Sequence, residues 1–92
     1  MVLKIERVTQ GGQTVLRLSG HLTANELDQV RAEIGALEVK TSLDLGEMAL
    51  VDIEAVRFLA NCERKGASLL HCPPYIREWI NRELKRFSDT AR

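Results

Sequence analysis

The chain has 92 residues, of which 45% are apolar and 28% charged, and its 13 basic residues balance 13 acidic ones. This length predicts a single domain covering residues 1–92, and the composition is typical of a folded globular protein rather than a disordered chain. No apolar run approaches the roughly 18 residues that span a bilayer, and the balanced charge disfavours a nucleic-acid surface, which needs clustered positive charge.

The first residues carry no charged segment followed by an apolar core, so no secretory signal is visible and we expect a cytoplasmic location. Two cysteines, Cys62 and Cys72, are too few for the disulfide framework of a small secreted domain. We therefore expect both to be reduced thiols that pack as small apolar groups.

The first half of the chain predicts a β-hairpin followed by a helix. Residues 2–8 and 13–19 alternate apolar and polar side chains on either side of two adjacent glycines, which is typical of a hairpin and its turn. Thr23 and Glu26 then have the spacing of a capping box. Apolar residues at helical spacing follow, so we expect this helix to run to about Leu37.

The middle of the chain predicts a strand, a loop and a second helix. Residues 38–45 form the expected strand, in which Asp44 needs a polar partner if it is buried. The loop from Gly46 to Leu50 leads to a helix that Asp52 can cap. Glu54 falls in the first turn of this helix, where the helix dipole favours an exposed negative charge by about 0.3–1 kcal/mol.

The second helix is expected to end at Lys65 and Gly66, with a cation in its last turn and glycine beyond it. Residues 67–72 predict a short strand, and the two prolines that follow stop it and suit the first turn of a last helix. We expect residues 88–92 to fray. The resulting ββαβαβα order predicts an α/β fold whose four-stranded mixed sheet has an antiparallel hairpin and then parallel strands.

Signatures of common enzyme and cofactor sites are missing from the sequence. There is no Gly-x-Gly-x-x-Gly, no phosphate-binding loop and no Gly-x-Ser-x-Gly. The histidines and cysteines match no common zinc spacing. Asp44, Asp52 and Glu54 have no lysine, histidine or glycine-rich loop beside them that would suit acid–base or magnesium chemistry. We predict that the protein is not an enzyme and has no cofactor and no metal.

The segment from Val15 to Ile80 resembles the STAS domain, the module shared by sulfate transporters and bacterial anti-sigma factor antagonists. Short motifs carry this likeness. Leu16 to Gly20 resembles the family's second strand and its exit, and Leu43 to Leu45 resembles the strand that ends in Asp-Leu-Ser. Leu50 to Val56 resembles the hydrophobic-Asp-Ser-Ser-Gly-Leu motif, Lys65 to Leu69 the step into the last strand, and Cys72 to Pro74 the proline turn.

The departures from the family pattern lie around its regulatory position. Asp52 keeps the motif's aspartate, whereas Ile53 replaces the first serine and Glu54 replaces the second, which is the family's phosphorylation point. Ala55 replaces a glycine, and Gly46 replaces the serine that ends the preceding strand motif. The resemblance therefore implies that a partner kinase finds no hydroxyl to modify at the usual position.

In the family, the unmodified form typically binds an anti-sigma kinase and the phosphorylated form releases it. Phosphoserine carries about −1.5 to −2 charges and three acceptor oxygens, whereas the Glu54 carboxylate carries one charge and two oxygens. Two interpretations of Glu54 stay open: a partial imitation of the phosphorylated state, or simply a favourable first-turn residue.

We predict a cytoplasmic, non-catalytic signalling module of bacterial anti-sigma factor antagonist type that binds another protein, such as an anti-sigma factor or kinase. The expected contact residues are Met48, Leu50, Asp52, Glu54 and Arg57. One alternative is an accessory STAS subunit of a lipid-transport ATPase. The other is a small-molecule or nucleotide-binding module, although acidic residues at the helix start would repel a phosphate.

Overall fold

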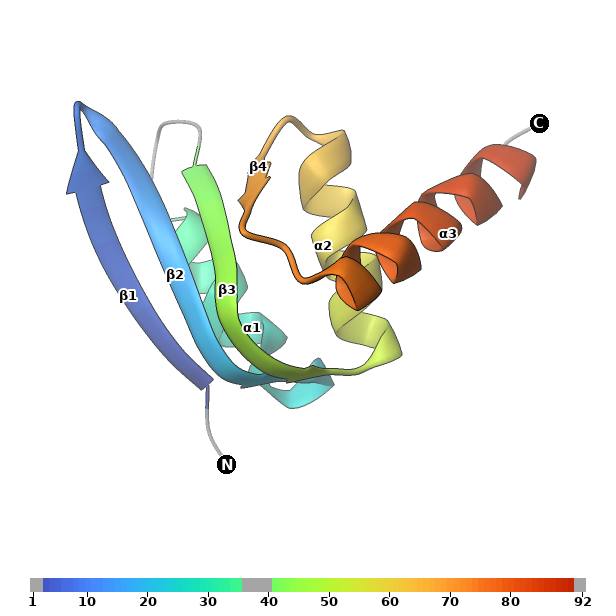
Figure 1. Cartoon of the computed structure of the whole chain (residues 1–92), viewed down its shortest axis with the longest axis horizontal. Coiled ribbons are helices and arrows are strands. Elements are labelled where there is room, and N and C mark those ends of the chain that lie inside the picture. The colour runs from blue at the N-terminus through green and yellow to red at the C-terminus, as the bar shows by residue number, and fades with distance from the viewer. Residues whose placement is uncertain (1–2, 36–40, 91–92) are drawn as a thin grey trace.

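The computed structural model describes residues 3–35 and 41–90, and its helices and strands follow the predicted ββαβαβα order (Figure 1). In chain order the elements are β1 (Leu3–Gln10), β2 (Gln13–Leu22), the short 3-10 helix η1 (Ala24–Glu26), α1 (Leu27–Gly35), β3 (Thr41–Val51), α2 (Ile53–Arg64), β4 (Ser68–Leu70) and α3 (Pro74–Thr90). Among the described residues, no helix is both long and apolar enough to cross a membrane.

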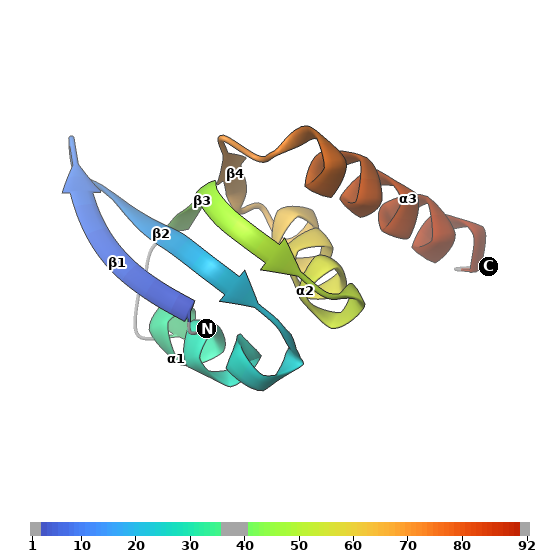
Figure 2. The same ribbon diagram turned by 60° about the horizontal axis from the view of Figure 1, so that its bottom comes forward.

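The four strands form one mixed sheet in the order β1-β2-β3-β4, which confirms the predicted topology. β1 and β2 are antiparallel, and their turn uses Gly11 and Gly12, both with positive φ angles that suit glycine. β2, β3 and β4 are parallel, so α1 and α2 are crossover connections. Both crossovers step in the same direction along the sheet, and right-handed connections therefore place α1 and α2 on one face (Figures 1 and 2).

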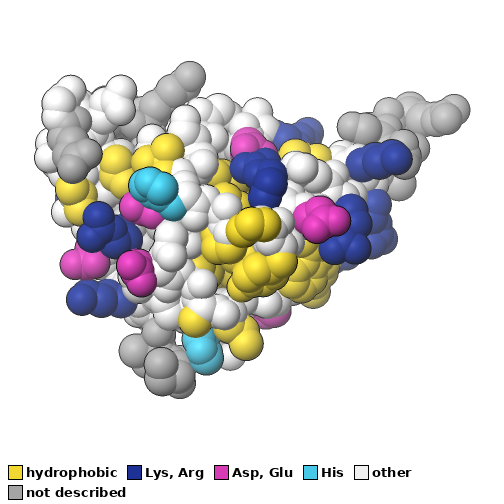
Figure 3. All heavy atoms as spheres, viewed as in Figure 1, with side chains coloured by type: hydrophobic (Ala, Val, Ile, Leu, Met, Phe, Trp, Pro, Cys, Tyr) yellow, Lys and Arg dark blue, Asp and Glu magenta, His cyan; other side chains and the backbone are white. Residues whose placement is uncertain are grey.

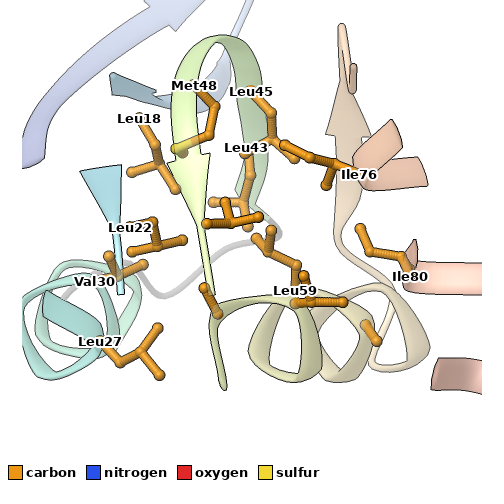
Figure 4. Close-up of a cluster of buried hydrophobic side chains, with 14 of the residues drawn as sticks. Leu18, Leu22, Leu27, Val30, Leu43, Leu45, Met48, Leu59, Ile76 and Ile80 are labelled. Carbon is orange, nitrogen blue, oxygen red and sulfur yellow. The ribbon is translucent and has the colours of Figure 1, made fainter. Parts of the chain in front are cut away.

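The hydrophobic core lies between this sheet face and the helices (Figure 4). Leu16 and Leu18 of β2 and Leu43 and Leu45 of β3 are fully buried, and they alternate with side chains that point to the other face. The helices cover these leucines with buried residues at helical spacing. These are Val30 of α1, Ala55, Val56, Leu59 and Ala60 of α2, and Ile76 and Ile80 of α3.

β3 differs from the prediction, because it continues to Val51 and includes the segment 46–50 that we expected to be a loop. Pairing with β2 persists along this segment through two register shifts, one between Arg17 and Ser19 and one between Gly20 and His21. Such irregularities let a strand keep its hydrogen bonds where the alternation of its side chains breaks down. The loop prediction was therefore wrong, since local sequence does not show this pairing.

The other element ends also differ in detail. β4 is limited to residues 68–70, and His71 ends it with a φ of +54°, a left-handed conformation that is uncommon for a residue other than glycine. α3 continues to Thr90, and residues 91–92 lie outside the described residues, so the fraying expected for residues 88–92 stays a prediction. The expected end of the first helix at Leu37 also lies outside them, and α1 is described as far as Gly35.

Candidate functional site

The candidate site lies where β3 ends and α2 begins, and Asp52 fixes the backbone at this point. Its Oδ1 atom accepts a hydrogen bond from the Ala55 backbone N–H at 2.9 Å, which confirms the predicted helix cap. Its Oδ2 atom accepts a second hydrogen bond, at 3.0 Å, from the N–H of Ala24 in η1. The sequence did not indicate this second bond, because Ala24 is 28 residues earlier in the chain.

The capping residues predicted before the first helix also meet. One carboxylate oxygen of Glu26 accepts hydrogen bonds from the Thr23 backbone N–H at 3.0 Å and from the Thr23 hydroxyl at 2.6 Å. A 3-10 turn begins here and continues into α1. The starts of η1 and α2 are therefore both held by side-chain hydrogen bonds, and Asp52 links them.

Glu54 lies in the first turn of α2, as predicted, and its side chain is 50% exposed. Its carboxylate is 3.6 Å from a guanidinium nitrogen of Arg57, one turn along the helix. Because both partners are solvated, this ion pair is worth less than about 1 kcal/mol. The Glu54 carboxylate is thus accessible to a partner molecule.

Arg57 also connects α2 to α3. Its Nε atom donates a hydrogen bond to Glu83 at 3.1 Å, and the Glu83 side chain is only 5% exposed. Arg86 lies 3.7 Å from the other oxygen of Glu83. The sequence did not reveal that Glu83 is buried, since its helix carries many charged residues. Arg57 therefore has a structural role beside its place next to Glu54.

The apolar residues predicted for this site separate into an exposed and a buried group. Leu50 is 45% exposed and Ile53 is 36% exposed, so both side chains present apolar surface to solvent. In the sequence they lie four residues and one residue before Glu54. Met48 is only 7% exposed and points into the core with Leu18 and Leu45 (Figure 4). This burial does not fit the prediction that Met48 contacts a partner, because the extended β3 turns its side chain toward the helices.

Hydrophobic side chains also gather on the surface above the start of α3 (Figure 3). Tyr75, in the first turn of this helix, is 50% exposed. Among the described residues it joins Leu50 and Ile53 as an exposed large hydrophobic side chain. Scattered exposed apolar residues are ordinary on protein surfaces. We therefore restrict the candidate site to the junction of β3 and α2.

Asp44 has the polar partners that its position in a strand required. It is 9% exposed and accepts hydrogen bonds from the Gly46 N–H at 2.9 Å and from Nδ1 of His71 at 3.2 Å, and Arg17 lies 3.6 Å away. Burial alone would raise the pKa of Asp44, but these hydrogen bonds and charges together hold the pKa below its ordinary value. The sequence predicted the need for partners but did not identify them.

The carboxylates considered for catalysis serve separate purposes in the structure: Asp44 holds the end of β4, Asp52 caps α2 and Glu54 is exposed. Within residues 3–35 and 41–90, no group of three or more histidine, cysteine or acidic side chains is placed to hold a metal ion. Cys62 and Cys72 are free and half-buried.

Together, the mixed four-stranded sheet, its two parallel crossovers and the capped start of α2 form a fold that is also found in solved structures. The structure is similar to that of the anti-sigma factor antagonist SpoIIAA in its unphosphorylated form, with a TM-score of 0.60 and 23% identity. That similarity covers 94% of this chain and 83% of SpoIIAA.

A second similar structure is the crystal structure of a protein described as Mglu, with a TM-score of 0.62 and 18% identity. The match covers 75% of this chain but spans only 19% of the length of Mglu. No protein-family model matches the sequence, and a comparison with curated proteins finds no match. At these identities the likeness establishes the fold, which is STAS-like and shared with SpoIIAA.

Proposed function

We propose that this protein is a non-catalytic protein–protein interaction module of anti-sigma factor antagonist type, and that its partner meets the junction of β3 and α2. The contact surface consists of Leu50, Ile53, Glu54 and the exposed part of Arg57. Asp52 supports this surface from below as a cap and does not itself need to touch the partner. The proposal includes a cytoplasmic location and no cofactor.

One observation carries this proposal: Glu54 is half-exposed in the first turn of α2, with exposed apolar residues directly before it. A charged group beside apolar surface is a common composition for a protein contact, where the apolar area supplies affinity and the charge sets orientation. The similarity to SpoIIAA, an anti-sigma factor antagonist, supports the class of module through its fold.

The same site has no switchable hydroxyl. The chain has no serine or threonine between Ser42 and Ser68, so phosphorylation of this segment on those residue types is impossible. Glu54 supplies a carboxylate at this position that phosphorylation neither creates nor removes. We infer that binding is controlled by the presence of the partner rather than by phosphorylation at residue 54.

The experiment begins with affinity capture from the native cell, using the wild type and Glu54→Lys in parallel. Each captured partner is then purified, and its affinity for both forms is measured by calorimetry. We expect Glu54→Lys to weaken binding about tenfold or more, which is about 1.4 kcal/mol, because the change reverses the charge that orients the partner.

Asp28→Lys is a matched control, because Asp28 is also an exposed first-turn carboxylate with an arginine three residues later, at 3.3 Å. It should bind the partner within about twofold of the wild type. Equal affinity of Glu54→Lys and the wild type would rule out this site. Capture of a transport ATPase subunit instead of a sigma-factor regulator would replace the proposed class of partner while keeping the surface.

A further inference from the structure

A groove of about 620 Å³ lies between α1 and α2, and only its Glu54 and Arg57 end adjoins the surface of the proposed function. α2 packs closely against α3 but makes only sparse contacts with α1, which leaves the space between them open. The apolar part of the groove comes from both helices. Leu27 and Ile34 belong to α1, and Phe58 and Cys62 belong to α2.

The charges around this groove are mostly positive, although the chain as a whole is neutral. Four cationic side chains line it, against a single carboxylate, Glu54, at one end: these are Arg31, Arg57, Arg64 and Lys65. Arg57 is paired with Glu54 and Glu83. Arg31 lies 3.3 Å from the highly exposed carboxylate of Asp28, a solvated pair that contributes little. The guanidinium of Arg31 lies 5.3 Å from the centre of the Phe58 ring, so positive charge extends over the apolar floor.

The thiol of Cys62 is influenced by two of these positive charges. Burial raises the pKa of its thiol above the ordinary value, and the nearby positive charges of Lys65 and Arg31 act in the opposite direction, toward the thiolate. Burial has the larger effect, so the neutral thiol is favoured, and the two cations only partly offset it.

The shape of the groove favours a helix over a small molecule. The groove is open to solvent, whereas sites for small ligands usually enclose about 70–90% of the ligand surface. The lining residues of α2 and of its C-terminal cap extend from Glu54 to Lys65, which is about 16 Å at 1.5 Å per residue. This length matches about three turns of a helix lying between two others.

We propose that the groove between α1 and α2 docks an acidic amphipathic helix of a partner protein. Its apolar residues, spaced three or four apart, would contact Ile34, Phe58 and Cys62, and its carboxylates would approach Arg31 and Lys65. The groove shares Glu54 and Arg57 with the surface of the proposed function but does not include Leu50 or Ile53. The docking contacts named here lie outside that shared part, so the inference goes beyond the proposed function and does not depend on it.

The test uses a fluorescein-labelled synthetic helical peptide of about 15 residues, with leucines at positions i, i+3, i+4 and i+7 and glutamates elsewhere. A second peptide has lysine in place of every glutamate. Binding to the full chain is followed by fluorescence anisotropy. We expect the glutamate peptide to bind at least tenfold more tightly than the lysine peptide, and to lose affinity as salt is raised.

The double variant Arg31→Glu and Lys65→Glu should weaken binding of the glutamate peptide at least tenfold. The matched control is Arg82→Glu with Lys85→Glu, which makes the same change in net charge at exposed positions of α3. It should bind within about twofold of the wild type. If the first double variant does not fold, glutamine at both positions removes the charges without reversing them.

Nuclear magnetic resonance of the isotope-labelled chain then locates the peptide. Supporting shifts fall on residues 27–35 and 54–65. Equal binding of both double variants, equal binding of both peptides, or stronger binding to vesicles of anionic phospholipid than to the peptide would overturn the proposal. Shifts centred on Leu50 and Ile53 would also overturn it, but they would leave the proposed function intact.

Discussion

The carboxylate of Asp52 accepts a hydrogen bond from the backbone of Ala24, 3.0 Å away and 28 residues earlier in the chain. The other oxygen of the same carboxylate caps α2 through Ala55 at 2.9 Å. One side chain thus fixes the start of α2 against the turn that precedes α1. The neighbouring Glu54 is presented on a backbone that is held from both sides.

Replacement of Asp52 by alanine should lower the free energy of unfolding by about 2 kcal/mol, because a helix cap is worth about 1 kcal/mol and a further hydrogen bond to a charged acceptor is lost. Asp52→Asn should cost about half as much, since an amide has a single acceptor oxygen and cannot accept from both Ala55 and Ala24. Urea denaturation followed by circular dichroism measures both changes. A loss below about 0.5 kcal/mol for alanine would contradict the described role.

Alanine substitution at two glycines should have opposite effects. A Cβ atom at Gly46 would lie 3.2 Å from both Asp44 Oδ1 and the His71 Cβ, so Gly46→Ala should destabilise the protein by about 1 kcal/mol through overpacking. At Gly35, an added Cβ would meet no described atom within 4 Å apart from its chain neighbours and the backbone of its own helix. Gly35→Ala should therefore stabilise by about 0.4–1 kcal/mol by restricting the unfolded chain.

Thermal and urea denaturation of the two glycine variants beside the wild type check this prediction. A stabilising effect at Gly46 would mean that Asp44 and His71 move aside without cost, and would contradict the close packing of this corner. The same result would also contradict close packing as the reason for glycine at this position, where the family that the chain resembles has serine.

Asp44 should make stability depend on pH in the acid range. Its pKa in the folded protein lies below the ordinary value of 3.8, so the unfolded chain binds its proton more readily. The stabilisation is therefore complete above about pH 4 to 5 and is lost as the pH falls through the folded value. Wild type should lose stability more steeply below pH 4 than Asp44→Asn, in which this group no longer titrates.

Urea denaturation at a series of pH values from about 2.5 to 7 tests this difference. A second acid, Glu63, also has its pKa lowered, mainly by its hydrogen bonds from Arg77, with burial acting in the opposite direction. Glu63→Gln is therefore the control that shows how much of the acid sensitivity has another origin. Parallel curves for wild type and Asp44→Asn would refute the contribution of Asp44.

The sequence predicted the order of elements, the mixed sheet and the cap at Asp52, because each depends on local patterns of apolar residues, turns and caps. It did not predict that β3 continues through residues 46–50, since that depends on pairing with β2 across two register shifts. The burial of Met48 follows from this longer strand. The predicted first-turn position of Glu54 is confirmed, whereas its contact with a partner stays a prediction.

The groove between α1 and α2 could not be predicted, because it depends on how far apart two helices lie on the sheet. The pairing of Arg57 with Glu83 joins residues 26 apart on different helices, and it too leaves no local pattern. The position of Asp44 did indicate a need for polar partners. Choosing His71 among the possible partners required the register of β3 and β4.

The double anchoring of Asp52 has a consequence for the kinetics of recognition. A partner that approaches the start of α2 meets a backbone that is already ordered, so little conformational entropy remains to be lost at that place when the complex forms. Association can then proceed as a rigid-body encounter, and differences in affinity among variants of Glu54 should appear mainly in how fast the complex dissociates.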